Sequence, residues 1–124
     1  MIAVDTSVMA ALLAGEAGTA IDQLVQALQS RRVVLPPVVV TELLSGPRTA
    51  ESAGALIAGL QVLDVVAGYW ERAGAVRRGI RKLGLKAHLA DALIAQSCID
   101  HDVPLLTRDT DFRHYAKHCG LKLA

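Results

Sequence analysis

The sequence predicts an α/β fold in which helices cover both faces of a mostly parallel sheet of four to five strands. Short apolar runs without polar alternation, such as Val33–Leu35, are typical of strands that are buried on both faces. Longer segments with apolar residues at helical spacing separate these runs, as in strand–helix–strand units. The expected fold is therefore a three-layer α/β/α arrangement in one domain, residues 1–124.

The composition indicates one hydrophobic core and excludes several classes of protein. Hydrophobic residues make up 52% of the 124 residues and charged residues 20%, which is too apolar for a disordered chain. Aromatic residues are only 3%, so a surface of many stacked rings for nucleic-acid bases is not expected. The two cysteines exclude a disulfide scaffold, and no apolar run reaches the ~20 residues of a membrane helix. We therefore expect a cytoplasmic protein without membrane contact.

The N-terminal segment predicts a strand, a turn and a short helix. Met1–Val4 is an apolar run that ends at Asp5-Thr6-Ser7, three residues that commonly cap helices. Residues 8–13 are apolar and lead to Gly15, a residue type that commonly ends helices. The turn between this strand and this helix is therefore expected at Asp5.

A second strand is expected at Val33–Leu35, between two helices. Residues 16–28 place apolar side chains at helical spacing and predict the first of these helices. Pro36 and Pro37 end the strand. Residues 38–44 are rich in β-branched side chains and would also suit a strand, but Pro37 is typical of a first helical turn and favours a helix.

The remaining elements alternate between helices and buried strands. In the helix expected over residues 69–83, the apolar face contains Trp70 and Leu83, and in the helix expected over 88–102 it contains Leu89. The further expected elements are a helix over 50–60, a strand over 61–66, a strand over 104–107 and a final edge strand over 121–123.

Charge is distributed unevenly along the chain. Residues 1–66 carry three basic and six acidic side chains, a net charge of −3, whereas residues 67–124 carry ten basic and six acidic ones, a net charge of +4. Five basic side chains lie close together near the end of the 69–83 helix: Arg77, Arg78, Arg81, Lys82 and Lys86. Such a cluster is either a solvated helix end that complements the helix dipole or a surface for an anion.

Acidic side chains follow two of the expected strands and occupy two of the expected helices. Asp5 and Asp109 come directly after strands, and Asp111 stands two residues beyond Asp109. Glu42 lies in the helix after the second strand, and Asp91 lies in the first turns of the helix expected over 88–102. Functional sites of open α/β sheets lie at the carboxyl ends of the strands, so these acids can converge on one edge.

Carboxylates at one edge would repel each other, so some of them would stay protonated unless a cation neutralised them. A ligand set of oxygens suits Mg²⁺ or Mn²⁺ rather than zinc, and such ions assist phosphodiester hydrolysis. Each acid also has an ordinary structural interpretation. Asp5 and Asp91 would suit a helix N-terminus, and Glu42 the surface of a helix. Asp109 and Asp111 would suit a turn, but the combination favours a metal site.

Four segments, taken together and in this order, resemble PIN-domain ribonucleases, and most closely the VapC-type toxins of bacterial toxin–antitoxin pairs. They are Ile2–Ser7, Pro37–Leu43, Leu89–Ala95 and Leu105–Phe112. The ordered set is far more specific than any one motif, and the resemblance covers residues 1–124. It implies a single PIN domain with a PIN-like three-layer fold.

The resemblance also implies a chemistry, namely Mg²⁺- or Mn²⁺-dependent endoribonuclease activity. The acids that it places around the ion are Asp5, Glu42, Asp91 and Asp109. Asp111 is an alternative for the last position or shares it with Asp109. Ser7 and Thr107 would assist these acids.

The resemblance further implies RNA as the substrate and a VapB-type antitoxin as the partner that neutralises the toxin. It also implies a homodimer and toxin–antitoxin hetero-oligomers. In this setting the basic cluster would hold RNA phosphates beside the acidic edge. The residues that we assign to this surface are Arg77, Arg78, Arg81 and Lys82.

Other functions remain open at this stage. A phosphoacceptor receiver domain has a similar length and element order, with Asp64 as its phosphorylated residue, but it also requires paired acids after the first strand and a Lys after the last. A non-catalytic interaction module could share the PIN fold. The pattern Cys98-x2-His101 … His114-x3-His118 superficially resembles a zinc site. Metal-dependent cleavage of RNA would distinguish a ribonuclease from these alternatives.

Overall fold

The computed structural model describes residues 1–124 and contains a four-stranded sheet in which all neighbouring strands are parallel. Its order is β3-β2-β1-β4, so the first and the last strand are neighbours. The strands are β1 (Ile2–Val4), β2 (Val33–Leu35), β3 (Gln61–Val62) and β4 (Leu105–Leu106). The predicted parallel sheet of four to five strands is confirmed.

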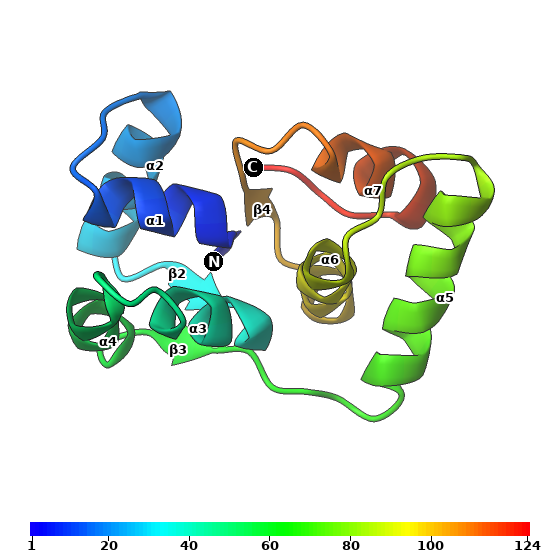
Figure 1. Cartoon of the computed structure of the whole chain (residues 1–124), viewed down its shortest axis with the longest axis horizontal. Helices are drawn as coiled ribbons and strands as arrows, with labels where there is room; N and C mark the ends of the chain where they lie inside the picture. Colours follow the sequence, from blue (N-terminus) through cyan, green and yellow to red (C-terminus); the bar gives the residue numbers. More distant parts are fainter.

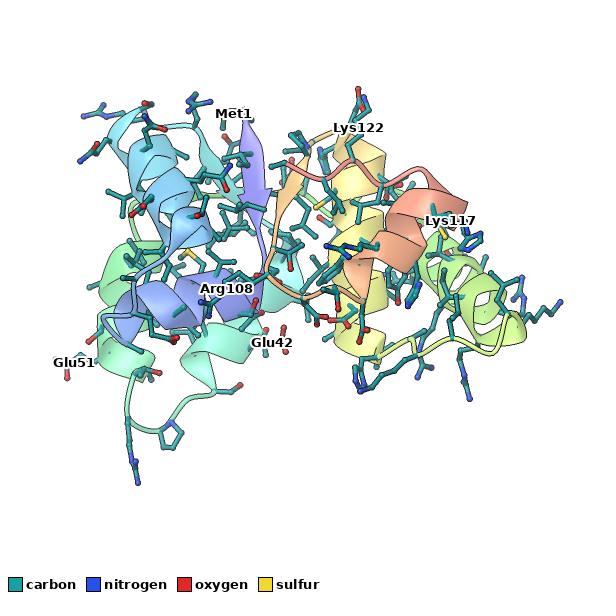
Figure 2. The ribbon with its side chains drawn as sticks, turned by 90° about the horizontal axis from the view of Figure 1, so that it is seen from above. Met1, Glu42, Glu51, Arg108, Lys117 and Lys122 are labelled. Atoms are coloured by element: carbon teal, nitrogen blue, oxygen red, sulfur yellow. The ribbon has the colours of Figure 1, made fainter.

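Two groups of helices enclose the sheet, with α1–α4 on one side and α5–α7 on the other (Figures 1 and 2). This arrangement confirms the predicted three-layer α/β/α fold. None of the helices has the length and apolarity that crossing a membrane would require. The helices are α1 (Thr6–Leu13), α2 (Thr19–Gln29), α3 (Pro37–Leu44), α4 (Ala50–Ile57), α5 (Tyr69–Lys82), α6 (Leu89–His101) and α7 (Phe112–Cys119).

The central strands β1 and β2 carry only apolar side chains, and all of their residues except Ile2 are buried between the two helical layers. Ala3 and Val4 of β1 have no exposed surface, and every residue of β2 is buried. In the parallel register, Ala3 pairs with Val34 on one side and Val4 pairs with Leu106 on the other. The carboxyl ends of β1 and β4 therefore lie side by side, which positions the site described below.

The outer strands differ from the prediction. β3 contains only Gln61 and Val62, both exposed, instead of the buried strand expected over residues 61–66. As an edge strand it has a neighbour on one side only, and little burial stabilises a longer pairing. Residues 121–123 form no strand, and Leu123 instead makes a single parallel bridge with Leu105 (the C-terminus lies beside β4 in Figure 1).

The prediction that Trp70 and Leu83 lie on the buried face of the helix expected over residues 69–83 is wrong, and so is the same prediction for Leu89. Trp70 and Leu83 are 62% and 53% exposed, and Leu89 at the start of α6 is 60% exposed. Tyr69 is buried in place of Trp70, because its hydroxyl donates a hydrogen bond of 2.7 Å to the backbone oxygen of Leu93. Periodicity alone does not decide which of two adjacent aromatic rings turns inwards.

α7 is an additional helix, absent from the sequence-based prediction. Its buried residues, Phe112 and Tyr115, are one turn apart, and four of the other residues are basic or histidine. These polar residues hide the apolar spacing in a helix of only eight residues. Gly120 ends the helix with a φ of 81°, in the left-handed region that glycine adopts without strain.

Candidate metal centre

Asp5 lies directly after β1 and forms the N-cap of α1. Its side chain accepts hydrogen bonds from the backbone N–H of Val8, at 3.0 Å, and from Ser7 Oγ, at 2.9 Å. Thr107 Oγ1, which follows β4, donates another hydrogen bond. Asp5 is only 3% exposed, and this burial raises the pKa of its carboxyl group, whereas the hydrogen bonds act in the opposite direction.

Thr107 also begins the loop that carries two further acids. Its Oγ1 accepts a hydrogen bond from the N–H of Asp109 at 2.9 Å, and Asp109 Oδ1 accepts one from the N–H of Asp111, also at 2.9 Å. These bonds hold the loop in a turn. A continuous chain of hydrogen bonds therefore joins Asp5, through Thr107, to both acids of the loop.

Asp91 reaches the same edge from the first turn of α6. Carboxylate oxygens of Asp91, Asp109 and Asp111 lie within 4.8 Å of one another, and we call these three residues the acidic cluster. The pKa of Asp91 is raised to about 6, first by burial and then by the negative charge of Asp109. His88 lowers this pKa, but its effect is the smaller one. Negative charge in the cluster is therefore incompletely compensated.

Glu42, on α3, lies outside the acidic cluster but near it. It is exposed, and its Oε1 accepts a hydrogen bond of 2.6 Å from Thr6 Oγ1 (Glu42 is labelled in Figure 2). Its negative charge contributes to the raised pKa of Asp91. Asp64 is different, because it follows β3 as an exposed residue whose backbone oxygen contacts His101, and it does not join the cluster.

The acidic cluster suits a divalent cation. All its ligand atoms are carboxylate oxygens, which are the ligands that Mg²⁺ and Mn²⁺ prefer. No side chain neutralises the cluster, since the ion pairs of the structure join other acids: Arg72–Asp100, Arg108–Glu16 and Lys122–Asp102. No other group of three His, Cys, Asp or Glu side chains has this proximity, so the cysteine–histidine pattern forms no metal site.

The family model for the PIN domain matches residues 2–118, a range that includes every acid described above. The chain belongs to the PIN domain family. Members of this family are nuclease-like hydrolases. A comparison with curated protein sequences gave no match.

Three solved structures share the fold of this PIN domain. A chain from VapBC2 of Rickettsia felis, bound to a DNA fragment from its promoter, has a TM-score of 0.77 and 19% identity, covering 100% of this chain and 98% of that chain. A toxin–antitoxin complex from Klebsiella pneumoniae gives 0.70 and 20%, covering 98% and 95%. FitAcB from Neisseria gonorrhoeae gives 0.70 and 19%, covering 99% and 96%.

The five predicted acids of the PIN domain differ in how close they lie to the acidic cluster. Asp91 and Asp109 belong to the acidic cluster, and Asp111 belongs to it as well, so both candidates for the last acidic position are present. Asp5 is buried beside the cluster and is linked to it by hydrogen bonds. Glu42 is the outermost of the five. Ser7 and Thr107, predicted to assist the acids, both donate hydrogen bonds to Asp5.

Tyr115 is a residue near this site that the sequence-based prediction missed. Its side chain has no exposed surface, and its hydroxyl has no hydrogen-bond partner in the protein. The pKa of Tyr115 is raised to about 12, first by burial and then by the negative charge of Asp91. The helical spacing of Phe112 and Tyr115 is the one signal in the sequence that would have placed this ring in the core.

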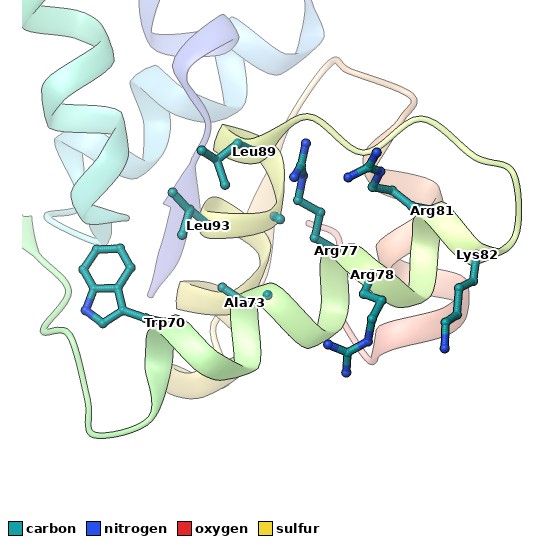
Figure 3. A pocket seen from close by; sticks show the side chains of 10 residues that line it. Trp70, Ala73, Arg77, Arg78, Arg81, Lys82, Leu89 and Leu93 are labelled. Atoms are coloured by element: carbon teal, nitrogen blue, oxygen red, sulfur yellow. The ribbon is translucent and has the colours of Figure 1, made fainter.

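The predicted basic surface lines a groove of about 550 Å³ between α5 and α6. Figure 3 shows its basic side chains on the C-terminal half of α5 and Trp70 at the other end of that helix. Lys86 does not contribute to this groove. The four basic side chains assigned from the sequence all line it: Arg77, Arg78, Arg81 and Lys82.

Proposed function

We propose that this PIN domain is a Mg²⁺- or Mn²⁺-dependent endoribonuclease that acts in the cytoplasm as the toxin of a toxin–antitoxin pair. The observation that carries the proposal is the acidic cluster, three carboxylates within 4.8 Å of one another without a neutralising side chain. The family match over residues 2–118 supports a nuclease-like hydrolase. The proposal assigns the catalytic centre to this cluster, together with Asp5 and Glu42.

The resemblance found in the sequence implies Asp5, Glu42, Asp91 and Asp109 around the ion, with Asp111 as an alternative to Asp109. In this proposal, Asp91, Asp109 and Asp111 would hold the ion directly, and Asp5 and Glu42, which lie outside the acidic cluster, would add negative charge at the same edge. When bound, Mg²⁺ or Mn²⁺ would supply a Lewis acid that activates water and stabilises the leaving oxygen. The protein contributes positioning: Asp5 fixes the hydroxyl of Thr107, which in turn orders the loop that carries Asp109 and Asp111. Above pH 6 the carboxyl group of Asp91 is mostly ionised and ready to bind a cation.

Purified protein tests this proposal by RNA cleavage in the presence of Mg²⁺ or Mn²⁺ and in excess chelator. Because water is the attacking group, the products should carry 5′-phosphate and 3′-hydroxyl ends. Asp91→Asn should lower the rate about a hundredfold or more, since it removes a ligand charge. Asp22→Asn is the matched control, because Asp22 is an exposed first-turn acid of α2 and should be dispensable. Products with 2′,3′-cyclic phosphate ends, or full activity in chelator, would contradict the proposal.

The toxin role rests on the likeness of fold to VapBC2 and to the toxin–antitoxin complex from Klebsiella pneumoniae. We propose a VapB-type antitoxin that places an Arg or Lys near the acidic cluster, because a guanidinium group forms two parallel hydrogen bonds with a carboxylate. The free protein should then cleave RNA, and the complex should cleave it at least about tenfold more slowly. Equal rates for the complex and the free protein would contradict this control.

We also propose that the PIN domain forms a homodimer and that the dimer assembles with antitoxin into hetero-oligomers. The exposed apolar side chains of Leu44, Val65 and Val66, which lie outside the groove between α5 and α6, support an interface with another chain. Light scattering at micromolar concentration should give the mass of two chains. A monomer under these conditions would contradict the homodimer without affecting the proposed chemistry.

A further inference from the structure

The α5–α6 groove is lined by Trp70, Gly74, Leu93 and the four basic side chains of α5. Its lining residues on α5 recur at helical spacing, so they form one continuous stripe along the helix. The middle of the stripe is open, because a Cβ atom placed on Gly74 would meet no other atom within 4 Å. The volume of about 550 Å³ is in the range of pockets that hold small organic molecules.

One end of the groove presents a flat aromatic face. Trp70 is 62% exposed, and its ring packs edge-on against Tyr69, with centroids 4.8 Å apart and planes at 74°. Tyr69 is itself fixed by its hydrogen bond to the backbone oxygen of Leu93. The Trp70 indole is therefore held in place by Tyr69, while most of its own surface stays accessible for stacking against another planar ring.

The other end of the groove is positively charged and has no internal counterion. No basic side chain of the groove takes part in any ion pair of the structure. Arg77 donates a hydrogen bond of 2.9 Å from Nε to the backbone oxygen of Ala87, which fixes its guanidinium group beside the groove. Arginine side chains held in this way are suited to phosphate oxygens.

The basic end of the groove lies near the acidic cluster. Arg77 lines the groove, and both its positive charge and the negative charge of Asp91 act on the pKa of Tyr115, so Arg77 and Asp91 both lie near this buried ring. Phosphates bound at the basic end would therefore lie in the neighbourhood of the three carboxylates. An acidic peptide would match the charge, but its carboxylates are not each accompanied by a planar ring, whereas every nucleotide carries both a phosphate and a base.

We propose that the α5–α6 groove binds single-stranded RNA, with phosphates on the basic end and one unstacked base against Trp70 and Leu93. This inference rests on the proposed function and deepens it, because it assigns a base contact of the proposed ribonuclease to Trp70 and Leu93. A single platform with an apolar floor offers no hydrogen bonds to base edges, so the groove accepts any base.

Trp70 is the only tryptophan of the chain, so its fluorescence reports on the groove directly. The probe is a ten-nucleotide 2′-O-methyl oligouridine in chelator, which binds without being cleaved. We expect saturable quenching of Trp70 emission. Inorganic polyphosphate should compete with the oligonucleotide but should not quench, because it has charge and no bases. A glutamate decapeptide should not quench, and it should compete more weakly than polyphosphate, because arginine binds phosphate oxygens in a bidentate manner.

Gly74→Leu tests the groove by filling it, and Gly79→Leu is its matched control. Both glycines lie in α5, both are exposed, and a Cβ atom meets nothing within 4 Å at either position, so neither variant should unfold. Only Gly74 lines the groove. Gly74→Leu should weaken oligonucleotide binding about tenfold or more, which is the usual scale for loss of one stacked base. Gly79→Leu should bind as the unchanged protein does.

The charge is tested by Arg78→Ala/Lys82→Ala, with Arg48→Ala/Lys117→Ala as a control of equal charge on exposed sites elsewhere. The groove variant should lower the slope of log affinity against log salt by about 1.4, since each lost phosphate contact on a single strand removes about 0.7. The control should keep the slope.

Three results would overturn the proposal: no quenching by the oligonucleotide, equal quenching by the glutamate peptide, or Trp70 emission that changes with protein concentration alone. The second would indicate an acidic peptide and the third a contact between copies of this chain. The binding assay involves no cleavage, so its result is independent of the nuclease proposal. If the oligonucleotide quenches Trp70 emission in a protein that does not cleave RNA, the proposed nuclease activity is refuted and the proposed RNA-binding groove is supported. Cleavage without quenching would refute the groove alone.

Discussion

Asp5 has two roles at the scale of the single residue, because β1 ends where α1 begins. As the N-cap it satisfies the N–H of Val8, and as the acceptor for Thr107 it joins the ends of β1 and β4. The sequence indicates either a cap or an acid of the site at this position. The structure shows that one carboxylate does both, since three donors surround it and leave it 3% exposed.

Asp91 gives the protein a distinctive pH dependence without metal. Its pKa is raised from 3.8 to about 6 in the folded protein, so folding favours the protonated form. The resulting stabilisation is complete below about pH 4 and is lost as the pH rises through 6. In chelator, the free energy of unfolding of the wild type should therefore fall relative to that of Asp91→Asn between pH 4 and 7. Denaturant titrations that run parallel for both proteins over this range would rule out the effect.

Thr107 should matter through its hydroxyl rather than its shape. Thr107→Val keeps the volume but leaves Asp5 with one donor fewer and the N–H of Asp109 without its acceptor. Loss of a hydrogen bond to a charged group costs about 2 kcal/mol of unfolding free energy. Thr107→Ser keeps the hydroxyl and should retain most of the stability. Denaturation in chelator measures both variants, and equal losses would show that the hydroxyl has no such role.

At the scale of elements, α5 and α6 are held together by a cluster centred on Asp100. Its carboxylate accepts hydrogen bonds from Arg72 Nε at 3.0 Å, Arg72 Nη2 at 2.6 Å and Gln96 Nε2 at 2.8 Å. Arg72 also donates to the backbone oxygen of Ala67, just before α5. This cluster sets the separation of the two helices and therefore the width of the groove.

Asp100→Asn should destabilise the protein at neutral pH but not in acid. The hydrogen bonds from Arg72 hold the pKa of Asp100 below its usual value, so their stabilisation is present above that value and lost as the pH falls. The melting temperature of the variant should be lower than that of the wild type at pH 7, and the gap should close towards pH 3. Asp102→Asn is the control, because its ion pair with Lys122 is mostly exposed and worth little. A difference in melting temperature that persists at pH 3 would contradict the role assigned to the ionised carboxylate of Asp100.

The elements that the sequence predicts well are those with a strong local signal. Pro37 begins α3 as expected, and β2 occupies the expected residues between Arg32 and Pro36. The outward turn of Trp70 could not be predicted, because it depends on a hydrogen bond between Tyr69 and α6, a contact between elements. The groove between α5 and α6 could not be predicted either. The sequence shows the basic side chains of α5, but it does not show that residues of α6 form the other side of the groove.

At the scale of the whole molecule, the strand order brings the acids together. Since β4 lies next to β1, the first and the last acidic segments meet although 102 residues separate Asp5 from Thr107. The parallel sheet predicts that strand ends share an edge, and this much could be inferred from the sequence. Which acids touch could not, because the distances depend on the turn of the 107–111 loop and on the tilt of α6.

The most direct test of the account is anomalous diffraction from crystals soaked in MnCl₂. The central claim is that Asp91, Asp109 and Asp111 hold the divalent ion that RNA cleavage requires. We predict an anomalous peak among these three carboxylates in the wild type and no peak there in Asp91→Asn. Wild-type crystals without a peak at the cluster, from protein that cleaves RNA at the same Mn²⁺ concentration, would contradict the account.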